Sequence, residues 1–288
     1  MHRTQAILTL LACLSAVPAA AREFSGARAL EFTRQAVSFG PRPPGSPAIH
    51  KLQAWLVGQL KPLKCEVIQD DFKAQTPHGP IAMKNIIAKF RGSSGRAVVF
   101  TGHYDTKYFA NDQFVGADDG GSSTGFLLEM AQVLSGEQRK DDVYLVWFDG
   151  EEAFGAWSDT DSLYGSRHLA QRWAQEGFIG RIRGLINVDM IGDRNLDIMQ
   201  EGNSSASLRT LVWASADKLG YGKYFLPGGG ATEDDHIPFV KMGVNALDLI
   251  DFNKDYWHTP RDTMDKLSAH SFEVVGVVLL DVLKQLEG

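Results

Sequence analysis

The sequence predicts a single-domain protein of the α/β class. From residue 97 onward, short apolar runs of strand length alternate with segments whose apolar residues recur at helical spacing, the pattern of βαβ units. The chain has 288 residues, of which 44% are hydrophobic and 22% charged, so it can bury a sizeable core. Chains of roughly this length in the α/β class commonly fold as one domain.

The first third of the chain predicts two helices followed by strands. Apolar residues recur at helical spacing in two segments on either side of Gly40–Ser46, a proline-rich stretch through which no helix could continue. Three short segments with β-branched or aromatic residues follow, and the last of them is continuously apolar, as expected for a buried strand. These elements are helices over residues 28–38 and 48–60 and strands over residues 65–72, 85–90 and 97–101.

The remainder of the chain predicts alternating helices and strands. Continuous apolar runs predict buried strands, and the segments between them carry apolar residues at helical spacing. The chain ends in an amphipathic helix. These elements are helices over residues 122–134, 162–175, 207–219 and 271–286 and strands over residues 143–148, 185–190 and 245–250.

Residues 1–21 are predicted to be a secretory signal, which leaves residues 22–288 as the mature domain. Met1–Arg3 supplies a positive end, residues 6–17 form an apolar run, and Pro18–Ala21 offers a small-residue cleavage site. The apolar run falls short of the roughly 20 residues that a membrane span needs, so no span is expected. We expect a secreted or periplasmic protein. A lipid anchor at Cys13 is the less favoured alternative, because the preceding residues fit that signal poorly.

The charge balance excludes some partners. Lys and Arg total 29 and Asp and Glu total 35, which gives a net charge of −6. No basic surplus is available to neutralise phosphates, so nucleic acid is not an expected partner. Cleavage after residue 21 would leave Cys65 as the only cysteine, so no disulfide could form within the mature chain.

Ionisable side chains follow four of the predicted strands. In an open α/β sheet ligands bind beyond the carboxyl ends of the strands, where these groups would gather. Imidazoles and carboxylates without a thiolate are typical of a catalytic zinc site with an open coordination position. The groups are His103 and Asp105, the acidic run Asp149–Glu152, Asp189 and His258, together with Asp118 and Asp119 in the turn before the helix at 122–134.

The pair Glu151–Glu152 is the most informative of these groups. A lone histidine after a strand is more often a hydrogen-bonded loop residue, and Asp119 alone could be a helix N-cap. Two adjacent carboxylates after an apolar strand, however, face desolvation and mutual repulsion, which raise the pKa of at least one of them unless a cation is present. A non-enzymatic, metal-stabilised binding protein would leave this pair without a role.

These residues resemble the zinc-dependent peptidases of the M28 clan, which also contains the animal-type glutaminyl cyclases. The resemblance runs from about Asn85 to the C-terminus. It implies a three-layer α/β/α sandwich with a central mixed, mostly parallel sheet, as in zinc aminopeptidases. It also implies metal ligands at Asp119, Glu152 and His258 and a catalytic base at Glu151.

Within the clan, several blocks look closer to the cyclases than to the aminopeptidases. The resemblance then implies that Trp157 and Trp257 form a small substrate pocket, and that Asp189 and Asp235 belong to a catalytic hydrogen-bond network. Without the resemblance, Trp157 could equally lie in the core. His168 and His236 are interpreted as structural. The blocks are His103–Phe109, Phe148–Phe154 with the segment up to Leu169, Asp234–Phe239 and Trp257–His258.

Three positions depart from the cyclase pattern. Asp248 stands where the mammalian cyclases have a histidine, Gly102 stands where they have a disulfide-forming cysteine, and Gly120–Gly125 is more similar to a peptidase turn. The first departure puts the proton relay in doubt. The second removes a covalent link and leaves the chemistry intact.

Two enzymatic functions follow from the resemblance. A cyclase would use one Zn²⁺ and convert the N-terminal glutamine of peptides to pyroglutamate with release of ammonia. An aminopeptidase would use two Zn²⁺ ions, with His103, Asp189 and the bridging Asp119 forming the second site. The ligands alone do not separate the two functions, and the pocket-lining blocks favour the cyclase. In either case the substrates would be the N-termini of peptides or proteins, and we expect a monomer.

Overall fold

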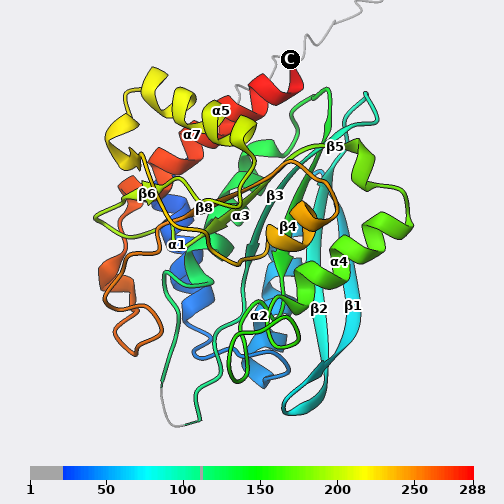
Figure 1. Cartoon of the computed structure of the whole chain (residues 1–288), viewed down its shortest axis with the longest axis vertical. Helices are drawn as coiled ribbons and strands as arrows, with labels where there is room; N and C mark the ends of the chain where they lie inside the picture. The colour runs from blue at the N-terminus through cyan, green and yellow to red at the C-terminus, as the bar shows by residue number, and fades with distance from the viewer. Residues whose placement is uncertain (1–21, 111–112) are drawn as a thin grey trace, which may run out of the picture.

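The computed structural model describes residues 22–110 and 113–288. A six-stranded sheet lies between two layers of helices, as Figure 1 shows. The predicted signal at residues 1–21 and the alternative anchor at Cys13 lie outside the described residues. Within the described ranges, no helix is both long enough and apolar enough to cross a membrane.

The sheet is mixed, and its strand order is β1-β2-β4-β3-β5-β8. β1 and β2 form an antiparallel hairpin, and β2 pairs antiparallel with β4. The four strands from β4 to β8 are parallel to one another. Their bounds are β1 Glu66–Thr76, β2 Gly79–Phe90, β3 Ala97–His103, β4 Asp142–Phe148, β5 Ile182–Asp189 and β8 Ala246–Ile250, with a separate pair β6 Ile198–Met199 and β7 Phe225–Leu226.

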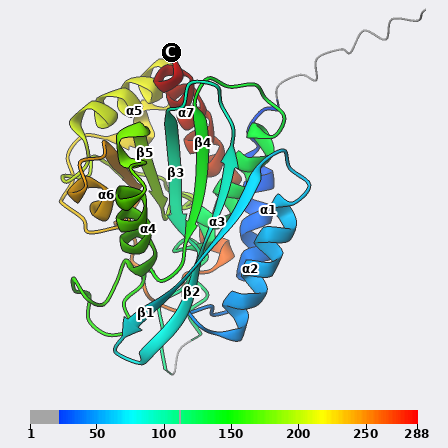
Figure 2. The same ribbon diagram turned by 90° about the vertical axis from the view of Figure 1, so that its right-hand side faces the viewer.

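Helices cover both faces of the sheet (Figure 2). α1, α2, α3, α5 and α7 pack on one face and share the larger apolar core, whereas α4 and α6 pack on the other. Their bounds are α1 Gly26–Val37, α2 Pro47–Leu60, α3 Gly121–Leu134, α4 Tyr164–Gln175, α5 Ala206–Lys218, α6 Ile237–Lys241 and α7 Ala269–Glu287. The predicted three-layer α/β/α fold with a mixed, mostly parallel sheet is confirmed.

Most predicted elements lie within a few residues of the observed ones. The largest difference is the first hairpin, where β1 and β2 extend toward each other and are joined by only two residues. Their facing ends are half-exposed, so the apolar signal that marks buried strands is weak there. The sequence also gave no expectation of α6 or of the pair β6 and β7, because five-residue and two-residue elements contain too few residues for a period.

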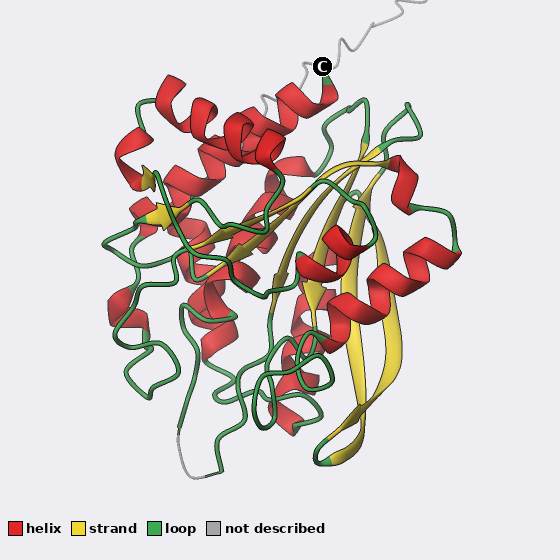
Figure 3. Cartoon of the chain, in the orientation of Figure 1, coloured by secondary structure: helices red, strands yellow, loops and turns green. Residues whose placement is uncertain are grey.

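The parallel strands all end at the same edge of the sheet. Figure 3 shows the loops gathered at the ends of these strands. His103 is the last residue of β3 and Asp189 the last residue of β5, while the loops after β4 and β8 carry Glu151, Glu152 and His258. The topology therefore brings together residues that are up to 155 positions apart, since 258 − 103 = 155.

Candidate active site

Two turns hold the acidic residues at this edge of the sheet. In the first, the main-chain N–H groups of Asp118 and Asp119 donate to the two carboxylate oxygens of Asp262, at 2.8 and 3.1 Å. Gly120, with φ of 76°, is the N-cap of α3, so Asp119 is not the cap and its carboxylate is available to a ligand. The positive φ explains why a glycine follows the aspartate here.

Arg42 also stabilises the turn that contains Asp118 and Asp119. Its guanidinium is fully buried and donates to the carbonyl oxygens of Tyr104, Val115 and Gly116. Burial lowers the pKa of Arg42 to about 10, although nearby carboxylates oppose the shift. Because its charge still exists at neutral pH, Arg42 also offsets part of the negative charge around Asp119.

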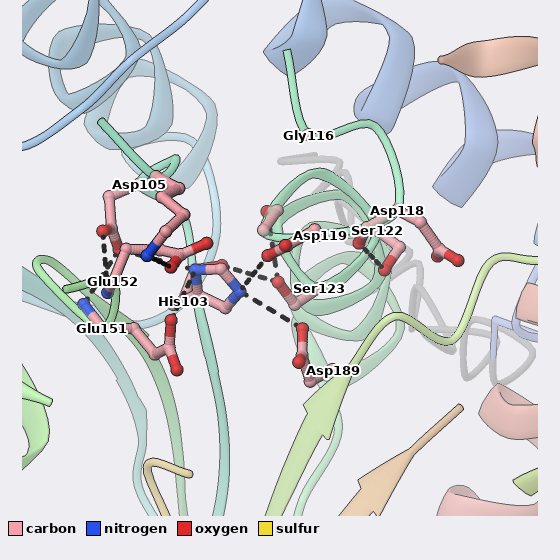
Figure 4. Close-up of polar contacts among 12 residues, drawn as sticks. His103, Asp105, Gly116, Asp118, Asp119, Ser122, Ser123, Glu151, Glu152 and Asp189 are labelled. Carbon is pink, nitrogen blue, oxygen red and sulfur yellow. Dashed lines mark hydrogen bonds and ion pairs between the residues drawn. The ribbon is translucent and has the colours of Figure 1, made fainter. Parts of the chain in front are cut away.

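In the second turn, one carboxylate fixes the Glu151–Glu152 pair. Asp105 accepts hydrogen bonds from the main-chain N–H groups of Glu151 and Glu152, at 3.1 and 3.3 Å (Figure 4). The two glutamate side chains are thereby separated. Glu152 points toward His258, while a Glu151 oxygen lies 3.9 Å from Nδ1 of His103.

The side chains of Asp119, Glu152 and His258 converge. Nε2 of His258 lies 2.9 Å from an oxygen of Glu152 and 3.3 Å from an oxygen of Asp119. One ligand atom from each residue lies within 4.8 Å of the others, which is close enough for all three to contact one metal ion. His258 has φ of 52°, a left-handed conformation that costs a non-glycine residue about 1–3 kcal/mol. This cost indicates that the position of the imidazole is imposed by the fold.

A second group of three shares Asp119. Nε2 of His103 lies 3.1 Å from Asp119 and 3.2 Å from Asp189, and these ligand atoms also lie within 4.8 Å of one another. The structure therefore assembles both of the predicted ligand sets around one bridging carboxylate. Figure 4 shows the His103 ring directed at both Asp119 and Asp189.

Burial and repulsion act strongly on the Glu151–Glu152 pair. Burial raises the pKa of Glu151 well above its usual value, and the negative charge of Glu152 adds to that shift while His103 opposes it. Burial and the charge of Asp119 likewise raise the pKa of Glu152, although His258 opposes this. The prediction that at least one of the paired glutamates has a raised pKa is confirmed.

A cavity of about 420 Å³ opens next to these groups. Trp157 and Trp257 line it, and both are partly exposed, at 37% and 38%, so Trp157 is not a core residue. Trp257 also stacks on the His258 imidazole with ring centroids 4.0 Å apart. Glu151 and Asp189 line the same cavity, as do the candidate ligands Asp119, Glu152 and His258.

Known proteins with this architecture are numerous. The sequence model of peptidase family M28 matches residues 85–283. The chain belongs to peptidase family M28. A glutaminyl-peptide cyclotransferase from Drosophila melanogaster is 32% identical over 249 residues, covering 77% of this chain and 70% of the relative.

Solved structures agree with this M28 assignment. A glutaminyl cyclase from an Acidobacteriales bacterium superposes with a TM-score of 0.88 at 37% identity, covering 95% of this chain and 98% of that one. A leucine aminopeptidase precursor from Bacteroides thetaiotaomicron superposes with a TM-score of 0.84 at 26% identity, covering 91% of this chain and 98% of that one. The M28 fold is thus common to proteins carrying both of the names that the sequence analysis weighed.

One predicted residue of this M28 chain does not face the cavity. Asp235 is fully buried and is absent from the cavity wall, whereas its neighbour Asp234 lines it beside Asp189. Asp234 begins the short turn into α6, so adjacent side chains there point in different directions. The residue pattern marks the Asp234–Asp235 block, but which of the two carboxylates faces the cavity depends on the local backbone.

Further polar groups support this M28 site from behind. His236 is buried, with Nε2 3.2 Å from Glu201 and Nδ1 3.9 Å from Asp248, so the structure supplies an imidazole next to Asp248 from a different position. His168 contacts Asp70 and stacks on Phe72, away from the cavity. A side chain at Gly102 would approach Ser123 and the Val188 carbonyl within 2.8 Å, which explains the absence of a cysteine there.

Sequence reasoning missed four site residues, which are Asp234, Asp262, Lys107 and Arg42.

Proposed function

We propose that this M28 protein is a zinc-dependent glutaminyl-peptide cyclotransferase, which converts the N-terminal glutamine of a peptide to pyroglutamate and releases ammonia. The observation that carries the proposal is the small cavity in which Trp157 and Trp257 stand beside Glu151 and the group around His258. The relatives named above as cyclases support it. The proposal concerns residues 22–288 as one catalytic domain.

Asp119, Glu152 and His258 would hold one zinc ion. Two carboxylates and one imidazole with an open position match the ligands of catalytic zinc sites. The fit is supported by the mutual repulsion of Asp119 and Glu152, which a divalent cation would relieve. When bound, the ion would supply Lewis-acid polarisation of the γ-carbonyl of the glutamine.

Glu151 would act as the general base and then as the general acid. Its carboxylate takes a proton from the α-amine as the amine nitrogen bonds to the side-chain carbonyl carbon (Cδ). It returns the proton to the departing nitrogen as the carbon–nitrogen bond of the side-chain amide breaks and ammonia leaves. The raised pKa of Glu151 suits both transfers, because a base is most effective when its pKa lies near the working pH.

Asp189 and Asp234 would steady the reacting carbonyl and amine by hydrogen bonds. Burial raises the pKa of Asp189 to about 7, and repulsion from Asp234 contributes, while His103 opposes the shift. A pair that shares a proton could donate to a developing negative charge. We assign Asp234 to this role in place of Asp235, since Asp234 is the one that lines the cavity.

The two tryptophans would select the substrate by size. Their indole rings stand at the cavity wall, where they would enclose a glutamine side chain and exclude water from it. Lys107 lines the same wall and donates to the carbonyl oxygen of Ala153 at 3.1 Å, which ties the wall to the Glu151–Glu152 turn. The remainder of the peptide would point out of the opening.

A dinuclear aminopeptidase is the second candidate, and the second ligand group favours it. His103 and Asp189 lie close enough to Asp119 to complete a second zinc site. In that reaction water would be the nucleophile, and Glu151 would take its proton. The structural relative named as a leucine aminopeptidase precursor supports this alternative.

One experiment separates the candidates. The purified, zinc-loaded protein is incubated with a glutaminyl peptide and a leucyl peptide, and ammonia and free amino acids are followed together by mass spectrometry. Ammonia from the glutaminyl peptide alone, with one zinc per chain by elemental analysis, is the expected result. Release of free leucine with two zinc ions per chain would contradict the cyclase and move His103 and Asp189 into the metal site.

Export and oligomeric state stay predictions. We propose that residues 1–21 direct the chain out of the cytoplasm, with Cys13 lipidation as the weaker alternative, and that the mature chain is a monomer. N-terminal sequencing of the protein recovered from its native compartment tests the first. Light scattering on the same sample tests the second.

A further inference from the structure

A second cavity adjoins the substrate cavity. Its volume is about 280 Å³, against about 420 Å³ for the first. Four residues line both cavities, so the second cavity lies directly beside the one that holds the candidate zinc ligands. The shared residues are Ala231, Thr232, Ile250 and Phe252.

One wall of the second cavity is held by main-chain pairing. The N–H of Gln200 donates to the carbonyl of Gly228 at 2.8 Å, and the N–H of Gly202 donates to the carbonyl of Gly230 at 2.9 Å. A side chain at Gly229 would lie 2.3 Å from the Gln200 carbonyl oxygen, so this close approach requires glycine. The wall is therefore a built surface with little side-chain bulk in front of its main chain.

A row of aromatic rings leads from the first cavity to Phe252, which lines both cavities. The His258 imidazole stacks on Trp257, and Trp257 contacts Phe252 with ring centroids 4.8 Å apart. Phe252 is 44% exposed and Met199, which lines only the second cavity, is 38% exposed. Apolar side chains are thus available to a ligand along the whole path.

The second cavity is also negatively charged. Asp197 and Glu201 line it, and no Lys or Arg is among the described residues that do so, although Lys254 lies 3.0 Å from Asp197 and offsets part of its charge from outside the cavity wall. Burial opposes ionisation of both carboxylates, but hydrogen bonds outweigh it. Lys254 helps to lower the pKa of Asp197, and His236 with nearby main-chain N–H groups lowers that of Glu201. Both groups carry a negative charge at neutral pH.

We infer that the second cavity is a subsite for the residue or two that follow the N-terminal residue of a peptide substrate, and that it prefers apolar side chains and rejects acidic ones. The inference rests on the proposed function for the identity of the first residue. It adds the direction in which the peptide leaves the reacting centre, past Phe252 toward Met199. The alternative path would lead past Lys107, which lines the first cavity and not the second.

The test compares three substrates with the full, zinc-loaded protein. Glutaminyl amide has no following residue, and the tripeptide amides Gln-Phe-Ala and Gln-Glu-Ala differ only in the second side chain. A glutamate side chain in the second cavity meets the charges of Asp197 and Glu201, so we expect KM for Gln-Glu-Ala to be about fivefold higher than for Gln-Phe-Ala. The assays are run at low ionic strength, and the difference in KM between the two tripeptides should shrink at high salt.

A charge variant with a matched control locates the effect. Met199→Lys places a cation at the second cavity and should narrow or invert the KM ratio between the two tripeptides. Met242→Lys adds the same charge at a residue that is 44% exposed and lines neither cavity, so its ratio should equal that of the unaltered protein. Thermal unfolding of both variants checks that they are folded.

The outcomes distinguish the two levels of the argument. If glutaminyl amide releases no ammonia, the proposed function fails. If the amide is converted but the KM ratio is near one, or if Met199→Lys and Met242→Lys give the same ratio, the function stands and the subsite is overturned. A ratio that changes in a Lys107 variant and not in Met199→Lys would place the peptide at the other exit.

Discussion

Two clusters of buried acids lie on either side of Asp119, and they are satisfied in different ways. On the cavity side, Glu151 and Glu152 face different imidazoles and repel each other, and none of the hydrogen bonds found among the described residues joins a main-chain N–H to their carboxylates. Behind the turn, Asp262 and Asp118 accept hydrogen bonds from main-chain N–H groups of Asp119 and Gly192. On the cavity side the partners of these carboxylates are side chains, namely the two imidazoles and the Lys107 ammonium 3.5 Å from Glu152, whereas on the rear side they are main-chain N–H groups.

This difference in hydrogen-bond partners distinguishes carboxylates that take part in the reaction from carboxylates that position other residues. A buried carboxylate with fixed N–H donors keeps its partners and holds the backbone in place. A buried carboxylate without them needs a cation or a proton, both of which can come and go. The predictions below test whether this division between the two clusters is real.

The largest effect is expected from Glu151→Gln on the cavity side. Removing the proton acceptor should lower kcat by about 10³-fold or more, because general acid and base catalysis contributes about 10²–10⁴-fold and the same group serves both transfers. Zinc content should be unchanged, since Glu151 is outside the group around His258. His258→Ala is the matched variant and should lose zinc together with activity. Retained turnover in Glu151→Gln would rule out both proposed mechanisms.

Arg42→Met tests the rear side. The guanidinium is fully buried among carboxylates and carbonyl oxygens, so its loss should lower the free energy of unfolding by about 3–5 kcal/mol. Urea unfolding measures the change. Arg42→Lys keeps the charge but not the contacts with all three carbonyl oxygens. Its free energy of unfolding should lie between those of the unaltered protein and Arg42→Met. Equal stability of the methionine variant would mean that the rear cluster does not depend on this cation.

A smaller effect is expected from Asp262→Asn. An asparagine keeps one of the two acceptor oxygens and places an NH2 donor against the main-chain N–H that the other oxygen served, so the turn should loosen around the ligand Asp119. Zinc affinity should fall about 10–100-fold, as for other residues that orient metal ligands. Competition with a chelator of known affinity gives the number. Thr263→Ala, at an exposed neighbouring side chain, is the control, and an equal loss there would show that the effect is not specific.

The smallest effect is a pH dependence of the metal-free protein. Burial raises the pKa of Asp118 to about 8, and hydrogen bonds with Asp119 and Glu152 overcome burial to raise that of His258 to about 9. Both groups bind more protons when folded than when unfolded, so stability is fully present below the unfolded pKa values and is lost as pH rises through about 8 and 9. The melting temperature of the metal-free protein should therefore fall between pH 6 and 9.

Zinc should cancel the cavity-side part of that fall. A bound cation takes the place of the proton on His258, whereas Asp118 stays behind the turn, bonded to Tyr256 and Gly192. The pH dependence of the melting temperature should be weaker in the zinc-loaded protein, and Asp118→Asn should weaken it further. A slope unaffected by zinc would contradict the division between the clusters.

The sequence was sufficient for most of the cavity side and insufficient for the rear. His103, Glu151, Glu152 and Asp189 follow strands, and the rule that parallel strands end at one edge brings them together without any knowledge of the loops. Arg42 lies in a proline-rich loop with no period, and nothing in its neighbours indicates that its side chain is buried. Which of Asp234 and Asp235 faces the cavity depends on a single turn, which residue patterns do not determine.

The buried position of Arg42 determines how far this enzyme can be truncated from its N-terminal side. The family match begins at residue 85, which invites the use of that point as a boundary for a minimal fragment. Such a fragment would lack Arg42, and it would also lack α1, which packs against α3 and α7. The segment before residue 85 looks dispensable by similarity, but it supplies the side chain that holds the turn containing Asp119. A split protein, with the early segment supplied as a separate peptide, would make recovery of activity a direct readout of that docking.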